Sequence, residues 1–206
     1  MITKSLLSKE QVGNRLRQAR HKQKLTLKQL SAKTGLALST ISKAELGQVT
    51  LSYEKFVVLA VALNIEVGSL FADSTAHAAT QQGGARIATH KYTDSPGYAT
   101  RNYDYGLLFG QLNDKHMNPM MAVIASRDVS EFDDYIRHPG QEFVIVLSGA
   151  ITIQFENGEK LSLDAHESAY FDSGIGHIYL STSEQDAKVL AVCTSEPPTG
   201  VAKRAR

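Results

Sequence analysis

The spacing of hydrophobic residues changes once along this chain, and that change limits the possible fold more than any other feature. From residue 9 to residue 71, apolar side chains recur every three or four positions, which is the period of an amphipathic helix. From residue 86 to residue 193 they alternate with polar residues or form short runs, as in β-strands. The segment between these parts, DSTAHAATQQGGAR, has the small and polar composition of a linker. The sequence therefore predicts an α+β chain of two domains.

The domain boundaries follow from this pattern. We expect a helical domain at residues 1–72, a linker at residues 73–85, an all-β domain at residues 86–195 and a flexible basic tail at residues 196–206.

Capping and stop signals predict five short helices in the first domain. Thr26 and Gln29 have the spacing of a capping box at a helix start, and Gly35 is placed to end that helix. Another helix is predicted over residues 38–46, and Ser52 is placed to cap the helix after it. With a last short turn before the linker, these elements would form a compact bundle.

The second domain is predicted to contain only strands. The candidate strands are DYGLLFGQL, MMAVIASRDV, EFVIVLS, AITIQF, KLSL, SAYF, HIYLS and AKVLAVC. The pair Asn157-Gly158 between AITIQF and KLSL indicates a hairpin. Short strands at this spacing favour a barrel or a double-sheet roll.

Charge is divided unequally between the two domains. Residues 1–72 contain eleven Lys and Arg against four Asp and Glu, a net charge of +7. Residues 73–206 contain eleven against seventeen, a net charge of −6. A basic domain joined to an acidic one is typical of a nucleic-acid-binding domain with a partner domain that does not touch nucleic acid.

Composition also bears on the cellular compartment. No apolar run approaches the ~20 residues that span a bilayer, and the N-terminus lacks the pattern of a secretory signal. The single cysteine, Cys193, excludes an internal disulfide and is expected to pack as a small hydrophobic residue in its strand. We therefore expect a cytoplasmic protein that does not interact with membranes.

The segment LTLKQLSAKTGLALSTISKAELG resembles the helix-turn-helix of the XRE family, and the resemblance extends over residues 12–71. The matching positions are Leu16, Arg20, Leu25, Thr26, Leu30, Lys33, Gly35, Ser39, Ile41, Ser42, Glu45 and Gly47. This resemblance implies a homodimer that binds palindromic double-stranded operator DNA, with the second helix of the motif in the major groove.

The resemblance also indicates which side chains would touch DNA. Those expected on the outer face of the second helix, towards the bases, are Leu38, Ser39, Thr40, Ser42 and Lys43. Lys24, Lys28 and Tyr53 are expected to contact phosphates. Ala37 stands where a capping Ser or Thr is expected, a loss of about 1 kcal/mol. The alternative is a bundle whose basic face is merely solvated.

The segment RHPGQEFVIVLSG resembles the first motif of the cupin family. His138, Glu142 and Gly149 match that motif, but Ile136 stands where its first histidine belongs. The second motif is matched at a glycine and at His177. The resemblance covers nearly all of the second domain and implies a double-stranded β-helix, or jelly-roll barrel, that senses a ligand.

In a cupin barrel, His138, Glu142 and His177 would point into the interior. Two imidazoles and one carboxylate form a facial triad that suits Fe(II) and also accepts Zn, Ni or Mn. The alternative is that the same side chains line a polar pocket and bind the ligand without a metal.

Three further residues are candidates for the ligand pocket: Tyr105, Arg137 and Tyr179. They would favour an anionic small molecule, because charged and hydroxyl donors bind anions strongly. Strand alternation places Tyr179 on the same face as His177.

Two functions are compatible with these patterns. The first is a transcriptional regulator whose cupin domain binds a small-molecule effector and modulates operator binding. The second is an enzyme, because a helical bundle followed by a cupin with this His, Glu and His pattern also resembles hydroxypropylphosphonic acid epoxidase, a mononuclear non-haem iron enzyme. Ser39, Ser42 and Lys43 keep a polar, basic outer face on the second helix, which favours the regulator. We therefore expect no catalytic residues.

Overall fold

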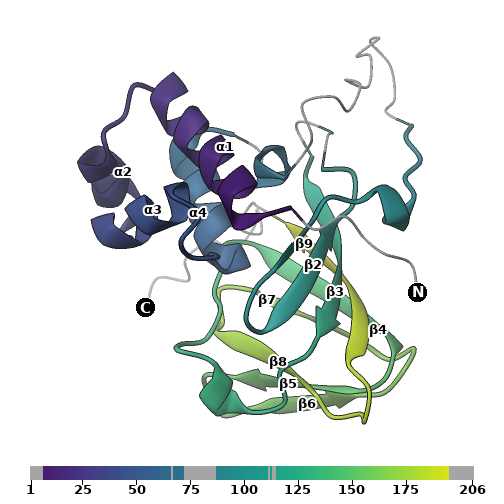
Figure 1. Cartoon of the computed structure of the whole chain (residues 1–206). Helices are drawn as coiled ribbons and strands as arrows, with labels where there is room; N and C mark the ends of the chain where they lie inside the picture. Colours follow the sequence, from purple (N-terminus) through teal and green to yellow (C-terminus); the bar gives the residue numbers. More distant parts are fainter. Residues whose placement is uncertain (1–6, 66, 72–86, 111, 113–114, 195–206) are drawn as a thin grey trace, which may run out of the picture. The chain divides into compact units, whose positions relative to one another are not determined.

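The computed structural model describes residues 7–65, 67–71, 87–110, 112 and 115–194, and the helices and strands are drawn in Figure 1. The chain divides into two compact units, one made of residues 1–101 and 105–114 and the other of residues 102–104 and 115–206. The predicted linker and basic tail lie outside the described residues. Among the helices that are described, none is both long and apolar enough to cross a membrane.

The first unit contains four α-helices in its described part. They are α1 (Lys9–Lys22), α2 (Leu27–Thr34), α3 (Leu38–Glu45) and α4 (Tyr53–Leu63). The fifth predicted helix is instead a single 3₁₀ turn, η1 (Val67–Leu70), so the prediction of five helices is wrong. Asn64 ends α4 with a left-handed backbone, and the four residues of η1 suit the tighter 3₁₀ geometry.

The predicted helix ends are confirmed except at α4. Thr26 and Gln29 form the capping box of α2, and Ala37 provides no side-chain cap for α3. Ser52 occupies the cap position of α4, but its hydroxyl donates to Glu54 and does not accept from the helix backbone. The start of α4 therefore relies on packing more than on its cap.

Close packing of α1 on α3 depends on a glycine. A Cβ atom at Gly13 would lie 2.3 Å from the carbonyl oxygen of Ala44, so any larger residue would push the two helices apart. Leu16, Leu30 and Ile41 are fully buried and join the first three helices in one core. This contact fixes where α3 lies in the bundle.

An aromatic cluster extends the first unit beyond its helices. The ring of Tyr98, in β1 (Gly97–Ala99), stacks on Phe71 at 4.4 Å between ring centroids and on Tyr105 at 4.9 Å. Phe56 of α4 meets Phe71 edge-on at 5.0 Å. Tyr105 belongs to β2 (Tyr103–Leu107). The segments at 97–99 and 105–107 thus belong to the same compact unit as the helices, although they follow the predicted linker.

The second unit is built from antiparallel strands in two sheets (Figure 1). The order in the larger sheet includes β3 (Met117–Ile124), β9 (Ala187–Thr194), β4 (Gln141–Ser148) and β7 (Ser168–Asp172). The smaller sheet has the order β6 (Lys160–Leu163), β5 (Ile151–Phe155) and β8 (His177–Ser181). Two short 3₁₀ turns, η2 (Tyr92–Asp94) and η3 (Val129–Glu131), complete the described elements.

The predicted hairpin and the strands from residue 142 onward agree with this structure. The first two predicted strands were placed too far along the chain, because DYGLLFGQL (residues 104–112) ends as β2 at Leu107 and MMAVIASRDV (residues 120–129) ends as β3 at Ile124. β5 pairs with β6 across the turn that contains Asn157 and Gly158, and Gly158 has a φ of 91° that favours glycine. Along β4, Val144 and Val146 are fully buried while Phe143 and Leu147 are exposed. Glu142 shares the inward face with these valines and therefore points into the core of the second unit.

Candidate metal centre and nucleic-acid interface

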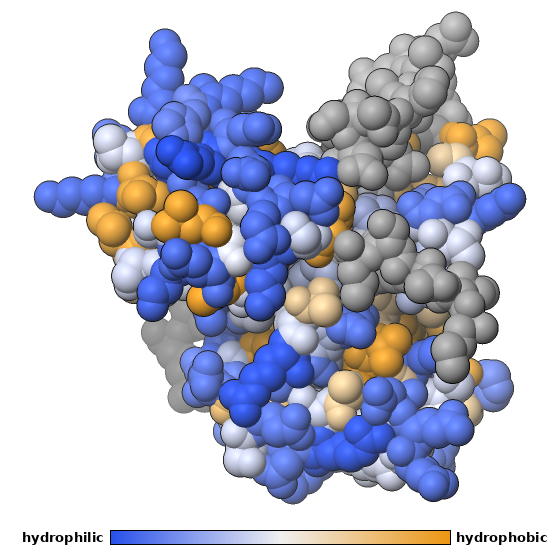
Figure 2. Space-filling model, in the orientation of Figure 1, coloured by the Kyte–Doolittle hydropathy of each residue, from blue (hydrophilic) through white to orange (hydrophobic). Residues whose placement is uncertain are grey.

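The outer face of α3 is open to solvent in the first unit. Leu38 is 45% exposed, and Ser39 and Lys43 are exposed as well, whereas Ile41 and Ala44 are buried against the bundle. The whole predicted base-reading set occupies the exposed or half-buried side of the helix: Leu38, Ser39, Thr40, Ser42 and Lys43. In Figure 2 hydrophilic residues cover most of the surface on view over the helices, with isolated hydrophobic ones between them.

The predicted phosphate contacts do not all share this exposure. Lys24 and Lys28, next to and within α2, are exposed. Tyr53 is only 4% exposed, and its ring packs 6.0 Å from that of Tyr105. Its role as a phosphate contact is therefore corrected to a core residue. The sequence did not show this, because it did not predict that Tyr105 packs with the helices.

A buried salt bridge holds α3 against α1. The guanidinium of Arg20 donates from Nε to Glu45 Oε1 at 2.6 Å and from a terminal nitrogen to Oε2 at 2.8 Å. A second terminal nitrogen donates to the carbonyl of Leu25 at 2.7 Å. Both charged residues are less than 8% exposed. This bidentate salt bridge orients α3. Both residues are among those that match the helix-turn-helix pattern, but the sequence did not predict that they pair.

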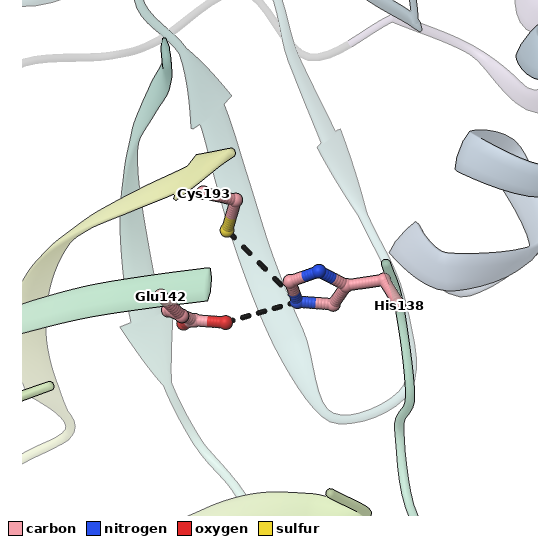
Figure 3. A group of neighbouring side chains, drawn as sticks. All are labelled: His138, Glu142 and Cys193. Atoms are coloured by element: carbon pink, nitrogen blue, oxygen red, sulfur yellow. Dashed lines mark hydrogen bonds and ion pairs between the residues drawn. The ribbon is translucent and has the colours of Figure 1, made fainter. Parts of the chain in front are cut away.

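In the second unit, a cluster of ionisable side chains meets around Glu142. His138 Nε2 lies 2.9 Å from Glu142 Oε2, and His177 Nε2 lies 3.4 Å from the same oxygen. The three residues predicted as metal ligands are therefore brought together, and each is at most 5% exposed. A further side chain, Cys193 of β9, lies beside His138 and Glu142 (Figure 3).

The strands determine which side chains enter this cluster. Glu142 in β4 lies directly opposite Cys193 in β9, so both side chains point to the same face of the larger sheet. His177 begins β8 and exchanges two backbone hydrogen bonds with Ile136. The backbone N–H of His138 donates to the carbonyl of Ser173 at 3.0 Å. Segments from both sheets thus converge on one buried point.

The hydrogen bonds of His177 specify its protonation pattern. Its Nδ1 lies 2.8 Å from the carbonyl oxygen of Ile175, which can only accept, so Nδ1 carries a proton. Its Nε2 therefore faces the Glu142 carboxylate either as an imidazolium N–H or as a lone pair. A proton on Nε2, or a metal ion held between the two groups, would make this 3.4 Å contact attractive.

Glu142 is held in its ionised form. Burial by itself would raise the pKa of its carboxyl group, but hydrogen bonds and positive charge from His138 and His177 lower that pKa below its ordinary value. Its other oxygen, Oε1, accepts a 2.5 Å hydrogen bond from the hydroxyl of Tyr179. Burial raises the pKa of the Tyr179 hydroxyl, and the negative charge of Glu142 raises it further. The phenol therefore keeps its proton and remains a hydrogen-bond donor.

Tyr179 is the predicted pocket residue that does reach the cluster. Its backbone N–H donates to the hydroxyl of Tyr103 at 2.7 Å, and that hydroxyl donates in turn to the Tyr179 carbonyl at 3.1 Å. These contacts fix the position from which Tyr179 donates to Glu142. Such an outer hydrogen bond orients a carboxylate ligand.

The other two predicted pocket residues lie elsewhere. Tyr105 belongs to the aromatic cluster of the first unit, so its assignment to the ligand pocket is corrected. The side chain of Arg137 is 40% exposed and forms an ion pair of 2.5 Å with Glu156, whose other oxygen accepts from the backbone N–H of Gly176. Arg137 therefore ties together the segments that precede the two histidines and does not enter the cluster.

Cys193 is the residue that sequence reasoning missed as a site residue. Its sulfur lies 3.9 Å from His138 Nε2, and ligand atoms of His138, Glu142 and Cys193 all lie within 4.8 Å of one another. Burial, and then the charge of Glu142, raise the pKa of the thiol. The pairing of β4 with β9 places Cys193 opposite Glu142, and alternation within either strand alone does not give that register.

These donors fit a divalent metal ion. Two imidazole nitrogens, one carboxylate and one thiol are ligand types that Zn²⁺ and other late transition metals prefer. Nε2 of His138 and Nε2 of His177 both approach Oε2 of Glu142, as ligands around one ion would. The chemistry that such an ion would supply is positive charge and, where a coordination position stays open, a binding point for a small molecule.

Each of the two parts of the chain matches the model of a known protein family. Residues 16–70 match the model of the helix-turn-helix family, and residues 128–193 match the model of the cupin domain. A search of curated proteins finds no match to this sequence.

Similarity to solved structures extends over nearly the whole chain. A transcriptional regulator of the HTH_3 family from Vibrio cholerae is 18% identical with a TM-score of 0.62, and the match covers 90% of this chain and 96% of that one. The Fe(II) form of HppE is 18% identical with a TM-score of 0.48, covering 91% and 100%. Hydroxypropylphosphonic acid epoxidase from S. wedmorenis is 20% identical with a TM-score of 0.47, covering 90% and 98%. The likeness to the regulator shows a shared fold. The chain therefore contains a helix-turn-helix domain, matched at residues 16–70, and a cupin domain, matched at residues 128–193.

Proposed function

We propose that this protein is a cytoplasmic transcriptional regulator that binds operator DNA through α3. The observation that carries the proposal is the face of α3 in the first unit. Ile41 and Ala44 hold the helix in the bundle, while Leu38, Ser39 and Lys43 are left exposed at the positions that read bases in helix-turn-helix proteins. The charge of +7 over residues 1–72 supports binding to a polyanion.

Phosphate contacts would come from the neighbouring helix. Lys24 and Lys28 are exposed next to and within α2, the first helix of the motif, which crosses the DNA backbone in proteins of this class. Thr40 and Ser42 add hydroxyl groups that donate to bases or phosphates. Tyr53 is not part of the proposed interface, because its side chain is buried.

We further propose that the cluster around Glu142 is where the cupin domain binds its effector. The side chains that meet there, His138, Glu142 and His177, suit a metal ion alone or a metal ion with a small anionic ligand. The effector would modulate operator affinity by binding one conformation of the regulator more tightly than another. By linkage, operator DNA would change the affinity for the effector by the same factor.

A homodimer would match a palindromic operator, and the outer face of the larger sheet supports one. Phe143, Val192 and Pro119 follow one another across β4, β9 and β3 on the face that points away from the core. Tyr170 of β7 continues this row and is 64% exposed. A continuous apolar sheet face of this kind is typical of a protein-protein interface.

The proposed interface is tested with variants that carry the same charge change at two places. Lys43→Glu alters the exposed face of α3, and Lys160→Glu makes the same change on β6 of the cupin domain. We expect Lys43→Glu to weaken binding to operator DNA by about 10- to 100-fold, the effect of losing one contact to a base. Fluorescence anisotropy with the upstream promoter DNA, across a salt series, measures this.

Lys160→Glu is the control for the effect of the charge change on DNA affinity. Lys160→Glu should leave DNA affinity and its salt dependence within a few-fold of the unmodified protein, because Lys160 lies outside the helix-turn-helix. Equal losses in both variants would point to non-specific charge attraction. An unchanged affinity in Lys43→Glu, with binding otherwise intact, would remove α3 from the interface.

The second candidate function is a mononuclear iron enzyme. The convergence of His138, Glu142 and His177 favours it, because this ligand set is used by non-haem iron enzymes. Iron analysis of the protein purified without added metal distinguishes the two candidates when combined with the DNA measurement. Near-stoichiometric iron together with weak, sequence-indifferent DNA binding would favour the enzyme.

A further inference from the structure

The cluster in the cupin domain has an unusual member. The motif position at which a cupin carries its first histidine is occupied by Ile136, which cannot bind a metal. Cys193 enters the same cluster from β9, a strand that contributes none of the motif residues, and its side chain is 3% exposed. Figure 3 shows its sulfur directed towards His138 beside the Glu142 carboxylate. Cys193 therefore completes a group of three side chains, with His138 and Glu142, that could hold a metal ion despite the loss of one histidine.

Three of the side chains have ligand atoms spaced closely enough to share one ion, because those of His138, Glu142 and Cys193 all lie within 4.8 Å of one another. Ligand atoms at 2.0 to 2.3 Å from a Zn²⁺ ion in tetrahedral geometry lie roughly 3.3 to 3.6 Å from one another. The observed separations are 2.9 Å for His138 Nε2 to Glu142 Oε2, 3.4 Å for His177 Nε2 to Glu142 Oε2 and 3.9 Å for Cys193 Sγ to His138 Nε2. Shifts of a few tenths of an ångström would bring these three separations to those values.

The charge of the cluster also favours a thiolate. All four side chains are buried, where uncompensated charge is costly. A divalent ion bound by Glu142 and neutral imidazole would leave a net charge of +1 in the core. A thiolate at Cys193 adds one negative charge, so the ion and its ligands would together be neutral.

We propose that Cys193 is a metal ligand and that, with His138 and Glu142, it forms a site for a thiophilic divalent ion of the Zn²⁺ type. The sulfur–metal bond forms as the thiol releases its proton to solvent. This inference rests on the proposed function in one respect, which is that the bound metal takes part in sensing the effector.

Cobalt(II) provides a direct test on the full-length protein after removal of metal by a chelator, in buffer without added thiol. A thiolate bound to Co²⁺ gives a charge-transfer absorption in the near ultraviolet, and tetrahedral Co²⁺ gives strong visible bands. Because Cys193 is the single cysteine, a charge-transfer band can only come from it. We expect one equivalent of Co²⁺ to produce both features and Zn²⁺ to remove them by displacement.

Variants show whether the sulfur itself is the ligand. Cys193→Ser should lose the charge-transfer band, and its affinity for Zn²⁺ should fall by more than the 10- to 100-fold that loss of an outer-sphere contact causes. Cys193→Ala serves as a second variant in case the hydroxyl disturbs the core, and circular dichroism verifies that each variant is folded. The exposed Asp164→Ala change is the matched control and should alter neither property.

Two results would overturn the inference. One is Co²⁺ binding with no charge-transfer band and with unchanged affinity in Cys193→Ser, which would mean an open triad of His138, Glu142 and His177. The other is absence of stoichiometric binding of either metal. DNA binding measured on the same samples separates this inference from the proposed function. A thiolate–cobalt band without operator binding would retain the site and reject the regulator, whereas operator binding without metal would do the reverse.

Discussion

The buried pair of Arg20 and Glu45 is the residue-scale feature on which the DNA-binding face depends. Replacing Arg20 by Ala would leave the carboxylate of Glu45 buried without its partner, and it would remove the ion pair between α1 and α3. Breaking such a pair typically costs about 3 to 5 kcal/mol. We expect Arg20→Ala to lower the free energy of unfolding of the helical unit by an amount of this order, measured by urea denaturation.

Arg17→Ala is the matched control for this variant. Arg17 lies one turn earlier on α1 and is exposed, so its removal should change the free energy of unfolding by less than about 0.5 kcal/mol. If Arg20→Ala were no more destabilising than Arg17→Ala, the salt bridge would not be what holds α3 in place.

Among single residues, the sequence predicted the three motif residues around Glu142 correctly but not the side chains that surround them. His138, Glu142 and His177 could be named because each stands at a motif position. Cys193 could not, because its place depends on the register between β4 and β9, which alternation within one strand does not determine. Tyr105 was misassigned because a tyrosine in a strand gives no indication of which unit its ring will join.

The outer face of the larger sheet leads to a prediction at the scale of elements. Phe143 lies on β4 at the centre of the apolar row that we propose to be the dimer interface, and it is 37% exposed. A charge introduced there would have to be buried without a partner in the dimer. We expect the unmodified protein to be a dimer by light scattering and Phe143→Glu to be mainly a monomer.

Leu161→Glu provides the comparison. Leu161 is 41% exposed, close to the exposure of Phe143, but it belongs to β6 in the other sheet. This variant should remain a dimer. A folded Phe143→Glu protein that also remains a dimer would place the interface elsewhere.

The elements themselves were largely predictable, for physical reasons. Alternation along β4, β5 and β9 follows directly from burial of one face, and the Asn157-Gly158 turn can adopt the backbone that a hairpin requires. The fifth helix was overestimated because a four-residue turn with two inward apolar residues has the spacing of both an α-helix and a 3₁₀ turn. Strand β1 was missed because three residues carry too little periodicity to recognise.

At the scale of the whole molecule, the chain joins a basic helical unit to an acidic β-rich unit. The segments around Tyr98 and Tyr105 belong with the helices, where their rings stack with Phe71. Composition predicted a domain boundary near the linker. It could not show that residues after the linker pack with the helices. Such long-range packing is decided by tertiary contacts, which local composition does not reveal.

Selection of bound sequences from a pool of random duplex DNA, using the unmodified protein, tests the central claim most directly. A dimeric helix-turn-helix regulator should enrich an inverted repeat whose half-sites lie about one helical turn, roughly 10 base pairs, apart from centre to centre. Enriched duplexes should also outcompete random DNA by at least about a thousandfold at physiological salt. Recovery of no shared sequence, with binding that depends only on salt, would contradict the assignment of this protein as a sequence-specific regulator.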